Sequence, residues 1–222
     1  MAVHYNQELV AESFLHTTKT HSERLIPMVL QLLENAEIDF GELQAVAVAA
    51  GPGSFTGLRI GMATAKGIAQ VRDIPIVGVN TLDALAQSGL GFSGLIAPVL
   101  DARKNEVYTS LYKDQGGEIT SVGQYRAITP ASLADELASR TEKIMFVGDA
   151  VPAYRELWRE RLSGQAIFLP DELSLPRGAH VGALAAQRLA RGEQDDLYGL
   201  TPFYIRLSEA EVTWAKKFGQ GV

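Results

Sequence analysis

Residues 45–70 read AVAVAAGPGSFTGLRIGMATAKGIAQ, and the rest of the predicted fold is built around this stretch. Its first six residues are apolar and β-prone, which is typical of a strand buried on both faces. The sequence Gly51-Pro52-Gly53 then predicts a turn. After the turn, Ser54 or Thr56 could cap a helix by accepting a hydrogen bond from a free backbone N–H group. We therefore predict a strand over residues 45–50 and a helix over residues 55–70.

The predicted helix carries a small residue at every fourth position, namely Gly57, Gly61, Ala65 and Ala69. Residues four apart lie on the same face of a helix, and a face without large side chains lets another helix approach closely. Glycine inside a helix costs about 1 kcal/mol relative to alanine. We therefore interpret this small-residue strip as a contact surface that packs against another helix, of the same chain or of a partner.

The strands and helices alternate through residue 86, which indicates an α/β fold with a mainly parallel sheet. The chain opens with a predicted hairpin, residues 2–5 and 9–15, and continues with a helix over residues 22–35. Glycines at 89, 91 and 94 predict either a boundary between lobes or a surface loop. The predicted domains are an N-terminal lobe over 1–94, a C-terminal lobe over 95–205 that opens with antiparallel strands, and a tail over 206–222.

Composition limits the class of protein. The 222 residues suffice for one large domain or two small lobes, and no apolar run reaches the length of a membrane span. The start MAVHYNQELV lacks the pattern of a signal peptide. The absence of cysteine excludes disulfides and thiolate metal sites. We expect a cytoplasmic protein with no membrane association.

Four stretches resemble the bacterial TsaB (YeaZ) family. They are GPGSFTGLRIGMATAKGIA at 51–69, IPIVGVNTLDALA at 74–86, LDARKNEVY at 100–108 and FYIRLSEAEVTWAKK at 203–217. The resemblance implies a two-lobed actin/Hsp70-like (ribonuclease H-like) fold. It also implies a non-catalytic role in making threonylcarbamoyladenosine next to the anticodon (position 37) of tRNA, as partner and activator of the catalytic TsaD.

The same resemblance implies a set of partners. They are a TsaD-type catalytic subunit, a TsaE-type ATPase in the same complex, a second copy of the chain in isolation, and tRNA reached only through the complex. Together with the small-residue strip, it places the partner interface on the helices at 22–35 and 55–70. The expected interface residues are Leu25, Val29, Leu32, Gly57, Leu58, Gly61, Ala65 and Ala69.

The family pattern begins with a strand and loop of the type ILAIDTAT, but here Ala2 and Val3 already match the family's second strand. In actin-like folds that first strand is central and begins the phosphate-binding part. A sheet without its central strand leaves unpaired backbone groups beside a core, which is costly. The departure puts nucleotide binding in doubt. We therefore expect no cofactor required by this chain, with ATP or ADP only at the interface with the partner.

Gly51, Gly53 and Ser54 are the weak candidates for phosphate binding, because backbone N–H groups at a helix start can cradle a phosphate. The stretch has neither the Gly-Lys-Ser/Thr of a Walker loop nor G-x-G-x-x-G. The alternative is a tight strand-to-helix turn, which we favour. A nucleophilic role for Ser54 or Thr56 would need a base, and the four histidines offer no evident pairing.

We predict no metal site and no catalytic residue. The family's catalytic relatives carry two histidines four apart on the helix that begins near His21, and here Leu25 stands four residues after it. Asp101, Arg103, Glu106 and Asp149 could be polar site residues or a solvated hairpin. An enzyme of the same superfamily, either an actin-like-fold ATP-dependent enzyme or a metallopeptidase-like hydrolase, is the alternative function.

The charge of the chain argues against a surface that grips nucleic acid by itself. The formal net charge is −6, and neutralising phosphates needs clustered lysine and arginine. If tRNA is involved, we expect the partner to make most of the contacts with it. The tail mixes aromatic and charged residues, and its Lys216 and Lys217 could add a contact at the rim.

Overall fold

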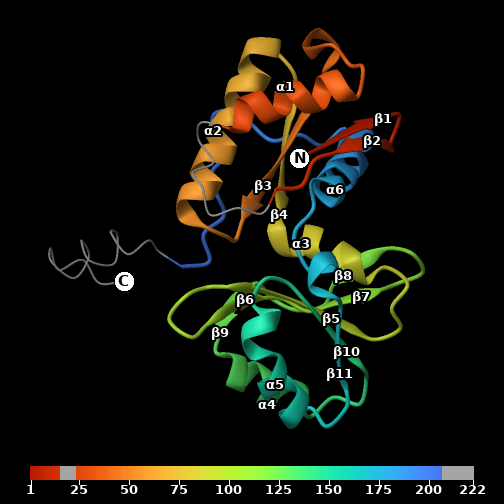
Figure 1. Ribbon diagram of the computed structural model, residues 1–222, viewed down its shortest axis with the longest axis vertical. Coiled ribbons are helices and arrows are strands. Elements are labelled where there is room, and N and C mark those ends of the chain that lie inside the picture. The colour runs from red at the N-terminus through yellow and green to blue at the C-terminus, as the bar shows by residue number, and fades with distance from the viewer. Residues whose placement is uncertain (16–23, 207–222) are drawn as a thin grey trace, which may run out of the picture.

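The computed structural model describes residues 1–15 and 24–206 of the chain. Figure 1 shows two lobes stacked along the long axis, with helix α3 (Thr81–Ala86) at their junction. The upper lobe contains the start of the chain, and the lower lobe contains its middle third. No helix in these ranges is both long enough and apolar enough to cross a bilayer.

The upper lobe begins with the predicted hairpin. Strand β1 (Ala2–Tyr5) pairs antiparallel with β2 (Glu8–Glu12). Asn6 and Gln7 connect them, and both adopt positive φ angles, 49° and 70°. A two-residue turn with both central residues at positive φ matches the twist of the flanking strands. The hairpin prediction is confirmed, although β2 ends earlier than expected.

Two strand–helix units follow the hairpin. In the first unit, helix α1 (Leu25–Asn35) leads through η1 (Phe40–Glu42) to strand β3 (Val46–Gly51). In the second, helix α2 (Phe55–Arg72) leads to strand β4 (Ile76–Asn80). The strands β3 and β4 run parallel to each other. The first two residues of the helix predicted over 22–35 lie outside the described residues. The prediction that the first strand is buried on both faces is wrong for residues 46–49, which are only half-buried. Among the described residues, only β4 pairs with β3.

The lower lobe is built on a seven-stranded sheet with the main order β11-β10-β5-β6-β9. Its strands are β5 (Leu95–Asp101), β6 (Val107–Thr109), β7 (Tyr112–Asp114), β8 (Ile119–Ser121), β9 (Arg126–Ile128), β10 (Ile144–Val147) and β11 (Ala166–Phe168). The antiparallel opening is confirmed. β6 and β7 are separate strands although only two residues lie between them, because they pair with different neighbours: β6 with β9 and β7 with β8.

Helices α4 (Pro130–Leu137) and α5 (Val151–Arg161) pack against each other beside this sheet, and η3 (Asp171–Leu173) follows β11. The indole of Trp158 stacks on the ring of Phe146 at 4.4 Å between centroids. Its Nε1 donates a hydrogen bond of 3.0 Å to the carbonyl of Pro130. A buried indole needs such an acceptor, so this pair ties both helices to β10.

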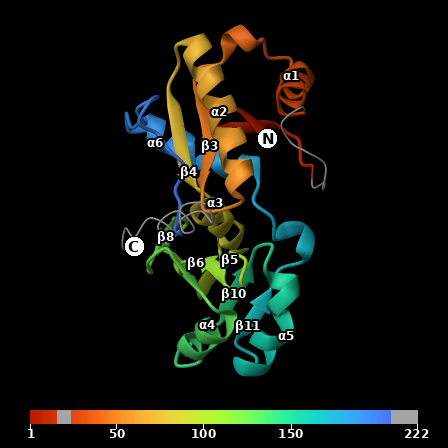
Figure 2. The ribbon, with the colours of Figure 1, turned by 90° about the vertical axis from the view of Figure 1, so that its left-hand side faces the viewer.

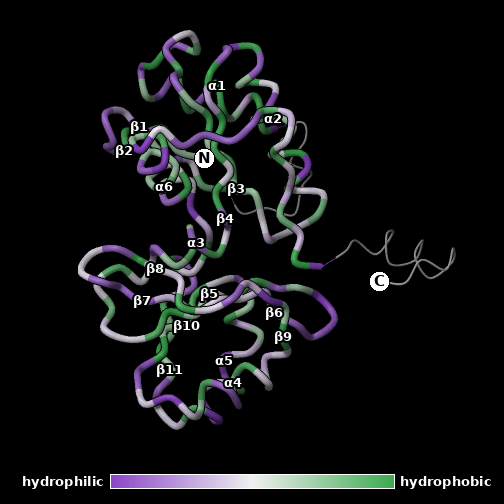
Figure 3. The backbone as a smooth tube through the Cα atoms, turned by 180° about the vertical axis from the view of Figure 1, so that it is seen from behind, coloured by the Kyte–Doolittle hydropathy of each residue, from purple (hydrophilic) through white to green (hydrophobic). Residues whose placement is uncertain are grey.

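The last helix returns to the upper lobe. α6 (Gly178–Ala190) packs against β1, β3, β4 and α3, and its Ala185 lies in one apolar cluster with Val77 and Val79 of β4. The predicted division at 94 and 205 is therefore wrong for this helix. The sequence shows its apolar pattern but not which lobe that pattern faces. Figure 3 shows hydrophobic stretches gathered in the strands of both lobes.

Candidate partner-binding site

Helix α1 has apolar residues on both of its sides. Leu32 and Leu33 are buried, while Leu25 and Val29 are half-buried. The outward side carries Ile26 and Leu30, which are 44% and 51% exposed. The interface residues expected from the sequence include neither of these two side chains. The sequence signal that could have revealed them is the i, i+4 spacing of Ile26 and Leu30, which gives α1 an apolar stripe facing solvent.

Helix α2 uses its small-residue strip inside the lobe. Ala65 and Ala69 are 6% and 1% exposed and pack with Ile76 in one apolar cluster. A Cβ placed on Gly61 would lie 3.9 Å from Cγ2 of Val48. The strip therefore brings α2 close to β3 and β4. Sequence reasoning predicted a close approach to another helix; the structure places these residues against a sheet.

The remaining predicted interface residues differ in exposure. Leu58 of α2 is buried at 9% exposure, whereas Gly57 and Gly61 are partly exposed. On α1 the partly exposed members are Leu25 and Val29. Figure 2 shows α2 in front of β3 and β4, with α1 beside its upper end. The available surface on this helix pair is therefore centred on α1 and on the outward side of α2.

The start of α2 is joined to the C-terminal segment by an aromatic cluster. The ring of Phe55 stacks on that of Tyr204 at 5.1 Å between centroids. The guanidinium of Arg59 lies 4.1 Å from the centroid of Phe55 and donates a 3.3 Å hydrogen bond to the hydroxyl of Tyr204. Such cation–π contacts add up to about 1 kcal/mol at exposed sites. They hold residues 203–206 across the junction of the lobes.

The glycine turn before α2 is covered by that same segment. A Cβ on Gly51 would lie 2.4 Å from the carbonyl oxygen of Phe203, and the N–H of Phe203 donates a 2.7 Å bond to the carbonyl of Ala50. Gly51 also has a φ of +121°, which favours glycine. Ser54 caps its own helix, since its Oγ accepts a 3.4 Å bond from the N–H of Gly57. This geometry favours the tight turn over the phosphate cradle.

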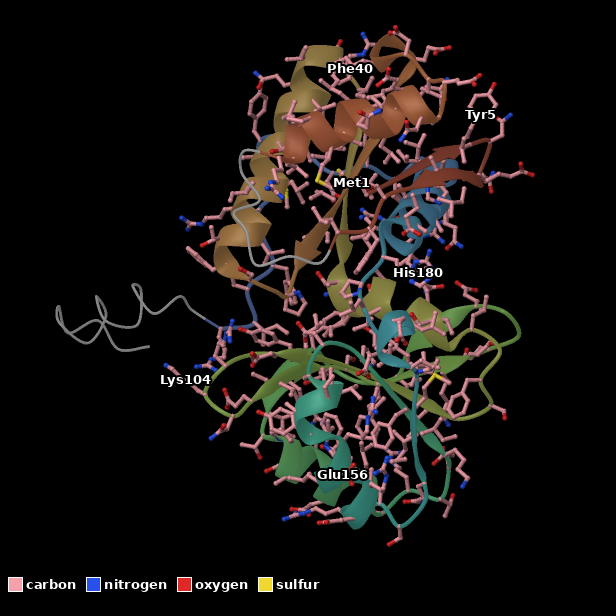
Figure 4. All side chains as sticks on the ribbon, viewed as in Figure 1. Met1, Tyr5, Phe40, Lys104, Glu156 and His180 are labelled. Carbon is pink, nitrogen blue, oxygen red and sulfur yellow. The ribbon has the colours of Figure 1, made fainter. Side chains whose placement is uncertain are left out.

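The polar residues around 101–106 do come together. Asp101 accepts a 2.8 Å bond from the N–H of Arg103 and forms an ion pair of 3.2 Å with its guanidinium. Asp149 in turn accepts a 2.9 Å bond from the N–H of Asp101, and Glu106 pairs with Arg206. Figure 4 shows the tip of this loop, marked by Lys104, at the outer edge of the junction. These side chains hold backbone and the C-terminal segment in place.

Asp83 forms a node at the lobe junction that sequence reasoning missed. Its Oδ1 accepts hydrogen bonds from the hydroxyls of Tyr112, at 2.6 Å, and Tyr125, at 2.7 Å. Burial and the hydrogen bond to Asp83 raise the pKa of Tyr125 to about 12, and burial also raises the pKa of Tyr112. Only the fold brings α3, β7 and the loop before β9 to one point.

A cleft of 520 Å³ lies between the lobes, bordered by Phe14 from the upper lobe and Asp149 and Pro152 from the lower lobe. Asp171, which pairs with Arg155, and Glu172 add two more carboxylates, and none of the described residues that line the cleft is a lysine or an arginine. An acidic lining disfavours a phosphate by like-charge repulsion.

The two histidines that the structure describes lie at α6. Burial lowers the pKa of His4 and of His180, and Arg177 lowers the latter further. His16 and His21 lie outside the described residues. Within residues 1–15 and 24–206, no three His, Asp or Glu side chains gather closely enough to hold a metal ion.

Residues 9–214 match the family model described as TsaD, tRNA N6-adenosine threonylcarbamoyltransferase. The tRNA threonylcarbamoyladenosine biosynthesis protein TsaB of Bacillus subtilis is 34% identical over 93% of this chain and 88% of its own. The protein of that name from Escherichia coli is 29% identical over 97% and 92%. The solved structure of YeaZ from Pseudomonas aeruginosa superposes with a TM-score of 0.70 at 29% identity, over 84% of each chain. The chain therefore belongs to the TsaB (YeaZ) family, within the homologous group that the TsaD model matches.

Proposed function

We propose that this protein acts in the biosynthesis of threonylcarbamoyladenosine on tRNA, as a non-catalytic partner and activator of a TsaD-type subunit. The shared family with TsaB proteins supports the pathway. The outward stripe of α1, formed by Ile26 and Leu30, is the observation that supports the partner role, because it is apolar surface on the outside of a folded lobe. Neighbouring apolar side chains exposed together are typical of protein–protein contacts.

The proposed interface is the α1–α2 surface centred on Ile26 and Leu30, with Leu25, Val29 and Gly57 around them. Exposed apolar side chains gain about 25 cal/mol for each Å² that a partner covers. In isolation the same surface is expected to pair with a second copy, since one patch can be complementary to itself around a two-fold axis.

The non-catalytic assignment is part of the proposal. The carboxylates of Asp101 and Asp149 are engaged with backbone N–H groups, and the glycine turn is covered by Phe203. No cofactor is required by this chain in the proposal, and ATP or ADP would bind only at the interface with the partner. A TsaE-type ATPase would join the same complex, in the cytoplasm.

The test is binding of the TsaD-type subunit by calorimetry. Leu30→Asp and Ile26→Asp should each weaken binding about tenfold or more, because they bury a charge in the contact. Val122→Asp is the matched control, since Val122 is 47% exposed in the lower lobe, away from α1. Unchanged binding by both α1 variants, with melting temperatures equal to that of the parent, would contradict the proposed interface.

Modification of tRNA by the assembled complex gives a separate readout of function. The α1 variants should lower it in proportion to their loss of binding. Turnover of ATP by the lone chain, in a preparation shown to be free of other ATPases, would instead favour an enzyme.

A further inference from the structure

Residues 203–206, which we call the clasp, link the two lobes at a third place. Within the described ranges the chain itself crosses between the lobes twice, from α3 to β5 and from β11 to α6. After α6 it runs along β4, where the N–H of Asp195 donates a 3.0 Å bond to the carbonyl of Ile76. Figure 1 shows its dark blue end beside the start of α2, at the level of the junction. The clasp therefore lies where it can contact both lobes.

The first two residues of the clasp hold the upper lobe. The N–H of Phe203 donates a 2.7 Å bond to the carbonyl of Ala50 in β3. The ring of Tyr204 stacks on that of Phe55 at 5.1 Å between centroids, and its hydroxyl accepts a 3.3 Å bond from Arg59. Backbone and side chain thus attach this end to β3 and to the start of α2.

The last two residues of the clasp hold the lower lobe. Ile205 packs against the apolar cluster in which α3 meets β5, β7 and β10. The guanidinium of Arg206 pairs with the carboxylate of Glu106 and donates a 3.4 Å bond to the carbonyl of Ala102. This end is therefore attached to the core of the lower lobe and to the loop between β5 and β6.

The loop that Arg206 binds has a backbone that needs support. Its residues 103–105 have φ angles of 63°, 53° and 57°. Residues other than glycine rarely adopt this left-handed region, and three in succession are costly. The loop is closed by a 3.0 Å bond from the N–H of Ala102 to the carbonyl of Glu106. Because Arg206 binds these same two residues, the closed clasp and the ordered loop stabilise each other.

Each contact of the clasp is weak by itself. The side chains of Arg206 and Glu106 are 29% and 31% exposed, and exposed ion pairs add little to stability. The contacts gain strength together, because a segment held at one end keeps its other end at a high effective concentration. The ring of Phe203 joins the two ends, since it also meets Tyr125 of the lower lobe edge-on at 5.6 Å. Loss of one end should therefore loosen the other.

We propose that the clasp opens and closes as a unit, which holds the lobes together and transmits a change at the 102–106 loop to α2. The closed clasp orders the start of α2, which borders the proposed partner surface at Gly57. A partner that binds this ordered start favours the closed clasp in turn, because linked equilibria are reciprocal. This last step rests on the proposed function, whereas the clasp itself does not.

The main test is hydrogen exchange of the Phe203 amide, followed by NMR in the full chain without a partner. Glu106→Gln neutralises the carboxylate at the lower end of the clasp. It should speed exchange of the Phe203 amide, at the upper end, by about threefold or more, since the ion pair is lost. The amide of Ile144, which donates a 2.9 Å bond to the carbonyl of Gln165, is the internal reference in the lower lobe.

Asp135→Asn is the matched control, because it also neutralises one carboxylate of an ion pair. Asp135 pairs with Arg161 between α4 and α5, within the lower lobe. This variant should leave exchange at Phe203 unchanged. Arg206→Gln should speed that exchange at least as much as Glu106→Gln does. The double variant should exchange no faster than Arg206→Gln alone, since both changes remove the same contact.

The distance between the lobes gives a second readout. The chain has no cysteine, so Gln187→Cys on α6 and Glu160→Cys on α5 place one spin label on each lobe. Both side chains are exposed. Tyr204→Ala, which removes the ring stacked at the start of α2, should broaden the distribution of distances between the labels, as should Glu106→Gln.

Three results would overturn the clasp. The first is unchanged exchange at Phe203 in Glu106→Gln with the melting temperature of the parent. The second is an unchanged distance distribution in Tyr204→Ala. The third is additive effects of Glu106→Gln and Arg206→Gln, which would mean separate contacts.

The coupling to a partner has its own outcome. Saturating TsaD-type subunit should slow exchange at Phe203 in the parent chain by about threefold or more. If the subunit binds and this exchange does not change, the coupling is wrong. If the subunit does not bind, the proposed function is wrong, and the measurements on the lone chain still decide the clasp.

Discussion

At the scale of single residues, Gly61 and Gly67 of α2 show that equal residues in one helix have different roles. A Cβ on Gly61 points toward Val48 of β3, whereas a Cβ on Gly67 would have no atom within 4 Å. The first glycine therefore permits the close packing of helix on sheet. The second only lowers helix propensity.

This difference predicts opposite effects of one substitution at the two positions. Gly61→Leu should destabilise the chain by about 1–3 kcal/mol, because the side chain is forced between α2 and β3. Gly67→Leu should stabilise it by about 0.5–1 kcal/mol through helix propensity. Urea unfolding of both variants measures the two values. Equal effects would mean that Gly61 does not face the sheet.

Tyr125 predicts the behaviour of the chain at high pH. Because its pKa is raised to about 12 in the folded state, the unfolded chain loses this proton first, near its ordinary pKa of about 10. Stability should therefore fall as pH rises from about 10 to 12. Tyr125→Phe should reduce the slope of unfolding free energy against pH in that window, and a slope identical to the parent's would contradict the role of this hydroxyl.

At the scale of elements, the hairpin is fastened to α6 through Glu12. Its carboxylate pairs with Arg177 and accepts a 3.1 Å bond from the N–H of Ala179. Burial acts to raise the pKa of Glu12, but the bonds from Arg177 and Ala179 outweigh it and the net pKa is lowered. The contact therefore depends on the charged form.

A lowered carboxylate pKa gives the sign of the pH effect. The stability from Glu12 is present above its ordinary pKa, about 4.5, and is lost as pH falls through the lower folded value. Glu12→Gln should destabilise the chain at pH 7 and reduce the loss of stability on acidification. Denaturant unfolding at pH 7 and pH 3 checks this, with Glu8→Gln on the exposed turn side of the same strand as the control.

At the scale of the whole molecule, the net charge limits the affinity of the lone protein for tRNA. With a formal charge of −6, the lone chain gains little binding free energy from contacts with phosphates. Filter binding at physiological salt should show no sub-micromolar affinity for tRNA. Lys216→Glu combined with Lys217→Glu should lower modification by the assembled complex modestly, by about twofold to fivefold, as expected for one or two phosphate contacts. Tight binding by the lone chain would make it an RNA-binding subunit.

The types and the order of the elements through residue 86 could be predicted from local patterns in the sequence. Local signals were enough for the hairpin at Asn6 and Gln7 and for the turn and cap before α2. These signals depend on φ preferences and on hydrogen bonds between residues a few positions apart. The same segments would therefore favour the same local structure in any chain. The four motifs that resemble TsaB were also readable without a fold.

Which surfaces pack against each other could not be predicted from local patterns. The small-residue strip could face a helix or a sheet, α6 could belong to either lobe, and Asp83 gave no local sign of its two tyrosine partners. The contacts of α6 and of Asp83 join residues far apart in the chain, and those of the strip join α2 to the strands directly before and after it. Their geometry follows from how the layers stack, because packing of one face excludes the alternatives and no local propensity encodes that choice.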